Sequence, residues 1–242
     1  MADGALIGRG DELDLARGLL RRAAAGSPGV LLVGGEAGVG RSRLVAAIVD
    51  EGRQAGFRVA VGTCVRMDAG ALTYAAIVDG LRGLVAELDP AEVASTLGVH
   101  RHQVARLLPE AVRSAPTEPG AGPGPASAED PMGRLLLFEA LTAWLNRLAE
   151  RGPLLLVVED LHWADAATLD LVRALAVGLA GPVALVVTTR TDEALAPPVQ
   201  VTLAELVRDG AERVELGPFD TPALAALAAQ LRRPAAPEPD ED

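Results

Sequence analysis

Residues 35–42 read Gly-Glu-Ala-Gly-Val-Gly-Arg-Ser, and this stretch decides how the whole chain is interpreted. It follows the apolar run 30–33, which is typical of a strand buried on both faces. The apolar residues of 44–49 continue the pattern as a helix. A strand, a glycine-rich loop and a helix in this order can surround a phosphate with backbone N–H groups, and the helix adds the positive end of its dipole.

The loop fits the P-loop pattern, Gly-x-x-x-x-Gly-Lys-Ser/Thr, at every fixed position except one. Gly35 and Gly40 have the required spacing, and Ser42 stands where a hydroxyl can ligate Mg²⁺. Arg41 occupies the lysine position, and its larger planar guanidinium is not equivalent to a compact ammonium at a crowded site. Arg43 should face another side of the helix, so it does not replace the lysine. The candidate nucleotide contacts in this segment are Gly35, Glu36, Ala37, Gly38, Val39, Gly40, Arg41, Ser42 and Arg43.

Two other interpretations of the loop stay open at this point. A glycine-rich turn between a strand and a helix can occur without any ligand. A dinucleotide-binding turn needs Gly-x-Gly-x-x-Gly, whereas the order here is Gly35-x-x-Gly38-x-Gly40, so the pattern favours this interpretation least.

Strands and helices alternate along the chain, which predicts an α/β fold with a parallel sheet covered by helices on both faces. Residues 116–131 are rich in proline and glycine, which predicts an exposed loop inside one domain of residues 1–231. Residues 232–242 predict a disordered acidic tail. The expected strands are 30–33, 57–62, 154–158, 183–187 and 213–216. The expected helices are 11–25, 44–49, 73–88, 91–97, 102–108, 132–151, 166–179, 203–207 and 221–231.

Polar residues stand at the ends of two of these strands. Strand 154–158 runs into Glu159 and Asp160, and in a P-loop fold this strand end points at Mg²⁺ and the attacking water. One carboxylate would hold the metal with Ser42, and the other would orient the water. Paired acids can also serve to start the next helix, for which Asp165 is a natural N-cap. Arg190 ends the following strand, where it either reaches a terminal phosphate or lies in an exposed loop. The catalytic candidates are Asp160, Glu159 and Arg190, and the metal candidates are Ser42 and Glu159.

Composition limits the possible partners and compartments. The formal net charge is −11, which disfavours direct binding of nucleic acid. Cys64 is the only cysteine, so no intramolecular disulfide can form, as is typical of a reducing cytosol. The chain start shows no signal-like segment, and the most apolar stretch, 174–187, is interrupted by Gly181-Pro182 and too short to span a bilayer. We therefore expect a cytoplasmic protein that does not enter a membrane.

Taken together, these motifs resemble the ATPase domain of the signal-transduction NTPases with numerous domains (STAND), within the wider AAA+ class. They are similar to the N-terminal ATPase region of large LuxR-type bacterial transcriptional regulators. The likeness covers about residues 5–231, and the combination is specific although no single piece is. It rests on the box 7–13 (IGRGDEL), the loop 35–44, the segment 158–165 (VEDLHWAD), the strand end 188–190 (TTR) and the turn 216–219 (LGPF).

The resemblance implies a P-loop NTPase fold, a three-layer αβα sandwich whose five parallel strands lie in the order 5-1-4-3-2. It implies ATP or ADP with Mg²⁺ as cofactors, and it places Gly8 and Arg9 near the adenine. It makes 188–190 a sensor of the nucleotide, and it implies protein partners or additional domains and a homo-oligomer. Arg41 departs from the family lysine, so the resemblance predicts nucleotide binding more strongly than hydrolysis. No complete helical lid, sensor repeat or DNA-binding helix-turn-helix is visible, so a role in transcription would need other segments or partners.

Three functions compete at this stage. The first is an ATP-binding switch domain, with slow ATP hydrolysis as an option. The second is a scaffold or protein-interaction module in which Arg41 marks a degenerate nucleotide site. The third is a phosphotransferase, which would need a cluster of arginines around an acceptor, and the sequence shows no such cluster.

Overall fold

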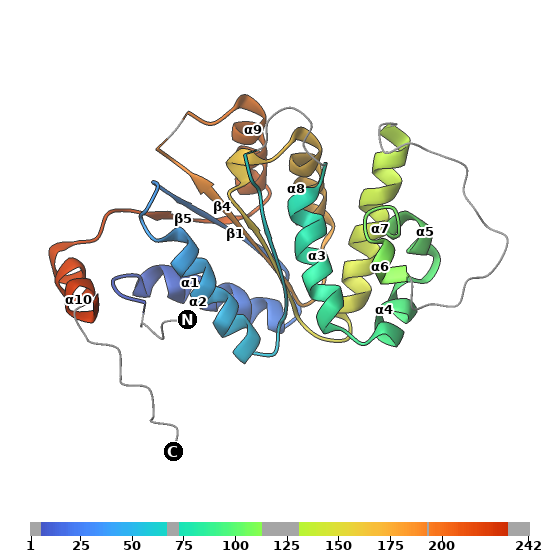
Figure 1. The fold of residues 1–242 in the computed structure, drawn as a ribbon, viewed down its shortest axis with the longest axis horizontal. Helices are drawn as coiled ribbons and strands as arrows, with labels where there is room; N and C mark the ends of the chain where they lie inside the picture. The colour runs from blue at the N-terminus through green and yellow to red at the C-terminus, as the bar shows by residue number, and fades with distance from the viewer. Residues whose placement is uncertain (1–5, 67–72, 113–130, 193, 232–242) are drawn as a thin grey trace, which may run out of the picture.

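The computed structural model describes residues 6–66, 73–112, 131–192 and 194–231 (Figure 1). The expected tail 232–242 lies outside the described residues. So does the expected loop 116–131, except for its last residue, Pro131, which already begins a helix. Within the described residues, no helix is long and apolar enough to cross a membrane.

Five parallel strands form a single sheet. They are β1 (Gly29–Gly35), β2 (Arg58–Thr63), β3 (Leu154–Glu159), β4 (Val183–Arg190) and β5 (Glu212–Leu216). Their order in the sheet is β2-β3-β4-β1-β5, with every neighbouring pair parallel. This is the predicted order 5-1-4-3-2 counted from the other edge, so the predicted fold is confirmed.

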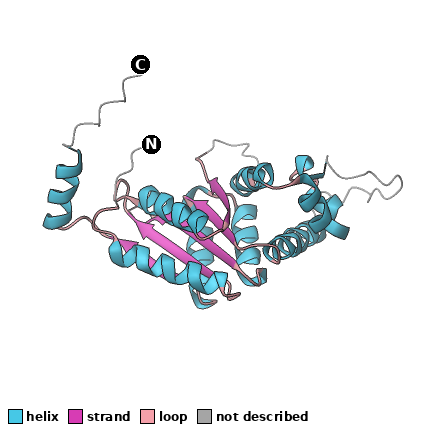
Figure 2. Cartoon of the chain, turned by 90° about the horizontal axis from the view of Figure 1, so that it is seen from below, coloured by secondary structure: helices cyan, strands magenta, loops and turns pink. Residues whose placement is uncertain are grey.

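Helices cover both faces of the sheet, as the alternating pattern predicts (Figures 1 and 2). One face carries α1 (Gly10–Ala24) and α2 (Arg41–Gln54). The other carries α3 (Ala75–Glu87), α8 (Ala166–Gly178) and α9 (Pro197–Arg208). Beyond α3 and α8 lies α7 (Pro131–Ala149), accompanied by the shorter helices between α3 and α7. These are α4 (Pro90–Leu97), η1 (Gly98–His100), α5 (Arg101–Val104) and α6 (Pro109–Val112). The chain is completed by η2 (Leu161–Trp163) before α8 and by α10 (Thr221–Leu231) after β5.

The apolar strands are buried on both faces because alternate side chains enter two different cores. In β1, Leu31 and Val33 pack with α1 and α2, whereas Leu32 packs in the core on the opposite face. In β4, Val186 packs in the core with α1 and α2, and Val187 packs in the core on the opposite face. Continuous apolar runs, rather than alternating ones, are what a strand of this kind requires.

Three predicted helices differ from the structure. Helix α9 begins at Pro197, six residues before the predicted start, because prolines are tolerated in the first turn of a helix, where their missing N–H is not needed. The predicted helix 102–108 is shorter than expected, since α5 ends at Val104 and residues 105–107 form turns. The predicted helix 44–49 is longer than expected and begins at Arg41, directly after the glycine loop.

Candidate functional site

The glycine loop connects β1 to α2 at the carboxyl edge of the sheet. Gly38 and Gly40 have φ angles of 76° and 104°, values that a side chain would make costly. Gly40 is the N-cap of α2 and has no side chain to occupy the first N–H groups of the helix. These donors and the positive end of the helix therefore face the loop, an arrangement suited to an anion.

Arg9 contacts the glycine loop through its guanidinium. It belongs to the segment 7–13 that the family resemblance places near the adenine. Its guanidinium donates to the carbonyl oxygens of Val39 (3.0 Å) and Gly217 (2.6 Å), and it pairs with Glu12 at 3.1 Å. It also lies 4.5 Å from the centre of the Phe219 ring. Only 5% of this residue is exposed, so Arg9 joins the glycine loop to the turn after β5.

Position 8, next to Arg9, requires a glycine. Its φ is 64°, and a Cβ atom at this position would meet the Cβ of Ala223 in α10 at 2.6 Å. The ring of Phe219 lies 3.3 Å from the same point. The box residues Gly8 and Arg9 thus pack against the segment that follows β5.

Arg41, the residue in the lysine position, turns toward the acidic end of β3. Its Nη2 lies 3.3 Å from the Oδ1 atom of Asp160, and the side chain is 12% exposed. Its Nη1 is buried and has no hydrogen-bond acceptor among the described residues. The guanidinium therefore neutralises one carboxylate and still presents a buried donor beside the glycine loop.

Ser42 and Glu159, the two predicted metal ligands, lie in contact. The Ser42 hydroxyl donates a hydrogen bond to the Glu159 carboxylate. Burial raises the pKa of Glu159 above its ordinary value, and the charge of Asp160 acts in the same direction. The structure brings together the hydroxyl and the carboxylate that a P-loop Mg²⁺ site needs.

Asp160 is held in an uncommon backbone conformation by the neighbouring strand. Its φ is 55°, in the left-handed region, and its backbone N–H donates to the Oγ1 atom of Thr188 at 2.9 Å. The turn points the chain into η2 and then to Asp165, which caps α8 through the N–H groups of Ala167 and Thr168 at 3.0 Å each. The predicted cap is confirmed.

His162 and Trp163 pack beside this acidic turn. The Nδ1 atom of His162 is 3.8 Å from the Oδ1 atom of Asp160, and its ring centre is 4.7 Å from that of Trp163. The guanidinium of Arg66 lies 5.1 Å from the Trp163 ring centre. These contacts cover the acidic turn with aromatic side chains.

Arg190 ends β4 next to the glycine loop, and its side chain is bound by a residue that the sequence reasoning missed. The Nε and Nη2 atoms of Arg190 donate to the two carboxylate oxygens of Asp192 at 3.0 and 2.6 Å. These hydrogen bonds hold the pKa of Asp192 far below its ordinary value. An acid two residues after a cation at a strand end is a weak signal, but it was available in the sequence.

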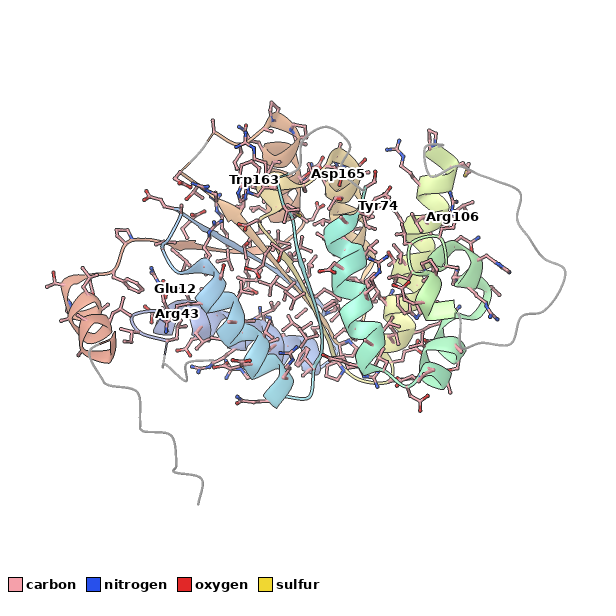
Figure 3. All side chains as sticks on the ribbon, in the orientation of Figure 1. Glu12, Arg43, Tyr74, Arg106, Trp163 and Asp165 are labelled. Atoms are coloured by element: carbon pink, nitrogen blue, oxygen red, sulfur yellow. The ribbon has the colours of Figure 1, made fainter. Side chains whose placement is uncertain are left out.

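Arg43 does not join the site on the Asp160 side. It is exposed and lies two residues after Arg41 on α2. Figure 3 shows Arg43 at the α1 and α2 side of the sheet, while Trp163 and Asp165 lie toward α8. The expectation that Arg43 cannot replace the P-loop lysine agrees with this position.

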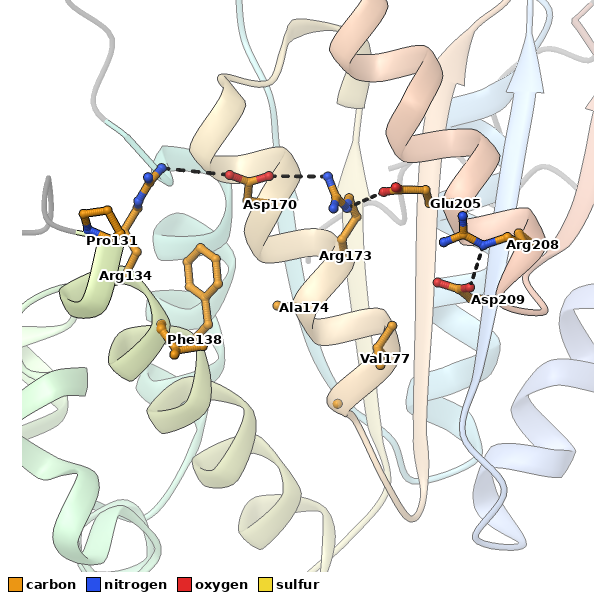
Figure 4. A pocket seen from close by; sticks show the side chains of 12 residues that line it. Pro131, Arg134, Phe138, Asp170, Arg173, Ala174, Val177, Glu205, Arg208 and Asp209 are labelled. Atoms are coloured by element: carbon orange, nitrogen blue, oxygen red, sulfur yellow. Dashed lines mark hydrogen bonds and ion pairs between the residues drawn. The ribbon is translucent and has the colours of Figure 1, made fainter.

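A separate cavity of about 560 Å³ lies between α7, α8 and α9 (Figure 4). Its charged residues pair with one another, from Arg134 to Asp170 to Arg173 to Glu205. None of the predicted site residues lines this cavity. The candidate chemistry is therefore at the glycine loop, not in this cavity.

A family model described as an AAA ATPase domain matches residues 5–188, which include the glycine loop and the acidic strand end. The chain belongs to this AAA ATPase family. A search of curated proteins finds nothing that matches it. The match covers three quarters of the AAA ATPase chain and ends at residue 188, so the glycine loop and the acidic strand end lie within it, whereas Arg190 and the turn 216–219 lie beyond it.

A solved structure shares the fold of this AAA ATPase domain at low sequence identity. The ORC2 protein of Aeropyrum pernix, solved in ADPNP and ADP complexes, is 16% identical, with a TM-score of 0.53 over 94% of this chain and 54% of that one. AMPPCP-bound DnaA of Aquifex aeolicus is 9% identical over 96% of this chain and 53% of that one, with a TM-score of 0.44. Drosophila ORC bound to DNA is 13% identical over 88% of this chain and 97% of that one, with a TM-score of 0.43. The chain spans about half the length of the ORC2 and DnaA chains.

Proposed function

We propose that this AAA ATPase domain is an ATP-binding regulatory switch with slow hydrolysis, of the kind attached to LuxR-type transcriptional regulators. The observation that carries the proposal is the buried Nη1 donor of Arg41, which has no acceptor in the described part of the chain and lies beside a glycine loop suited to an anion. A buried donor without an acceptor is costly, so the site is better satisfied when a phosphate is present.

Each residue of the site has a role in this proposal. The segment 35–42 and the start of α2 hold the phosphates, and Arg43 stays at the outer side of the helix. Ser42 and Glu159 hold Mg²⁺, the latter through water, and the metal supplies charge neutralisation for the phosphates. Asp160 orients the attacking water, and Arg190 contacts the terminal phosphate. Gly8 and Arg9 position the wall of the site near the adenine.

Calorimetric titration of the protein with ATP or ADP in the presence of Mg²⁺ tests the binding. We expect a Kd in the micromolar range for the natural protein. Ser42→Ala should lose more nucleotide affinity with Mg²⁺ present than with Mg²⁺ absent. Arg21→Ala, an exposed substitution in the last turn of α1, serves as the control and should bind like the natural protein. If neither nucleotide produces heat at high protein concentration, the proposal is refuted.

A second function is favoured by one specific contact. The Arg41–Asp160 ion pair occupies the carboxylate that should activate water, as expected of a scaffold whose catalytic site is degenerate. Phosphate release by the natural protein and by Arg41→Lys separates the two functions. Turnover that appears only in the lysine variant favours the scaffold, whereas steady turnover by the natural protein eliminates it.

The proposal also covers the extent of the domain and the partners that respond to its nucleotide state. We propose that residues 1–231 act as one unit, and that protein partners, additional domains or further copies of the chain read the nucleotide state. Direct binding of nucleic acid is not part of the proposal, because the formal net charge of the chain is −11.

A further inference from the structure

Both cations that would meet the phosphates are paired with a carboxylate. Arg41 pairs with Asp160 through one contact at 3.3 Å. Arg190 is bound more closely, because Asp192 accepts hydrogen bonds from two of its nitrogen atoms at 3.0 and 2.6 Å. A two-point contact of this kind fixes the plane of a guanidinium as well as its position.

Asp192 lies at the rim of the glycine loop and not in a distant turn. Gly35 is the register partner of Arg190 in the β1–β4 pair, and the N–H of Thr191 donates to the Gly35 carbonyl at 3.2 Å. The chain after β4 thus runs beside the start of the loop. The backbone N–H of Ala37 is close enough to stabilise the Asp192 carboxylate.

We propose that Asp192 competes with the terminal phosphate of ATP for Arg190, and so lets the site distinguish ATP from ADP. The inference rests on the proposed nucleotide-binding function. Asp192 is a positioning residue: it holds Arg190 until a ligand offers the guanidinium a better acceptor.

The direction of the effect follows from which ligand reaches Arg190. The Asp192 carboxylate occupies the Nε and Nη2 edge of the Arg190 guanidinium, so a phosphate can bind that edge only by displacing it. ATP must displace Asp192 in order to contact Arg190 through these two nitrogen atoms, whereas ADP lacks the phosphate that would do so. The contact therefore weakens ATP binding selectively, and a ligand shifts such an equilibrium only by its different affinity for the two states.

Calorimetric titrations with ADP and with a non-hydrolysable ATP analogue test the inference. Asp192→Asn keeps the shape of the side chain but removes its charge, and we expect the affinity for the ATP analogue to rise roughly tenfold, within the usual size of such couplings. Affinity for ADP should change less than about twofold. Asp192→Glu restores the charge, so its ratio of the two affinities should lie closer to that of the natural protein.

The matched control is Asp209→Asn, which removes the carboxylate from another arginine–aspartate pair, Arg208–Asp209, at the end of α9. Its two affinities should equal those of the natural protein. If Asp192→Asn changes both nucleotides equally or neither of them, while the natural protein binds both, the inference is overturned and the proposed function stands. If the natural protein binds neither nucleotide, the proposed function fails and this inference fails with it.

Discussion

Replacing Arg9 by alanine tests whether one buried guanidinium holds three segments of the AAA ATPase domain together. Arg9 donates to the carbonyl oxygens of Val39 and Gly217, which lie 30 and 208 residues away along the chain. It also pairs with Glu12 and lies against the ring of Phe219. Arg9→Ala removes all four contacts and leaves two carbonyl groups without their donor.

The expected cost can be built from these contacts. Each hydrogen bond from a charged donor contributes about 1.5–3 kcal/mol, and the contact with the ring adds about 1 kcal/mol. Because the contacts share one group, they do not add fully. We therefore expect the free energy of unfolding to fall by about 3–5 kcal/mol, as for other broken buried charge contacts. At about 2–4 °C per kcal/mol for a domain of this size, the melting temperature falls by about 6–20 °C.

Thermal and urea unfolding of the natural protein and two variants measure this loss. Arg21→Ala removes an exposed arginine from the last turn of the same helix and should change the free energy of unfolding by less than about 0.5 kcal/mol. Arg9→Lys keeps the charge but cannot donate to both carbonyl groups in one plane, so its loss of unfolding free energy should lie between those of Arg9→Ala and Arg21→Ala. An Arg9→Ala variant as stable as Arg21→Ala would refute the role assigned to the guanidinium.

Three further predictions concern the acidic edge and the sheet. Gly62→Ala should lower the free energy of unfolding by about 3 kcal/mol in urea titrations, because its Cβ would lie 1.9 Å from the backbone carbonyl oxygen of Ala76. A loss below about 1 kcal/mol would contradict this close approach. Asp165→Ala should cost about 1 kcal/mol by the same measurement, since it removes the acceptor that caps α8, whereas Asp165→Asn should cost less. Glu159→Gln should raise the melting temperature at pH 7. A carboxyl whose pKa is raised on folding is destabilising once ionised, so the gain should shrink as the pH falls through the raised pKa of the folded state and be lost below the unfolded pKa of about 4.3. An equal gain at pH 7 and pH 4 would contradict this sign.

Much of the fold could be predicted from local patterns. The apolar runs of β1, β3 and β4 are continuous because both faces of each strand are buried, and continuity is visible without any knowledge of partners. The cap at Asp165 depends on residues within three positions of it, so it too was predictable. The order of the strands could not be predicted from periodicity, and only the family resemblance indicated it.

The contacts that determine how the candidate site works could not be predicted in the same way. Whether Arg41 faces a phosphate or Asp160 depends on two segments more than a hundred residues apart in the sequence. The carbonyl partners of Arg9 lie 30 and 208 residues away from it. Asp192 was close to a predicted site residue, but its importance comes from the path of the chain beside Gly35, which is a property of the sheet.

The substitution of arginine for lysine in the glycine loop has a physical consequence beyond a change of size. A lysine offers one ammonium, which must leave a carboxylate in order to contact a phosphate. The guanidinium of Arg41 has separate nitrogen atoms: Nη2 lies near Asp160, while Nη1 is buried and finds no acceptor among the residues that the structure describes. Arg41 can therefore hold the carboxylate and a phosphate together. The same contact occupies one oxygen of the Asp160 carboxylate, which leaves this group less free to orient an attacking water. This geometry supports the proposed combination of nucleotide binding with slow hydrolysis.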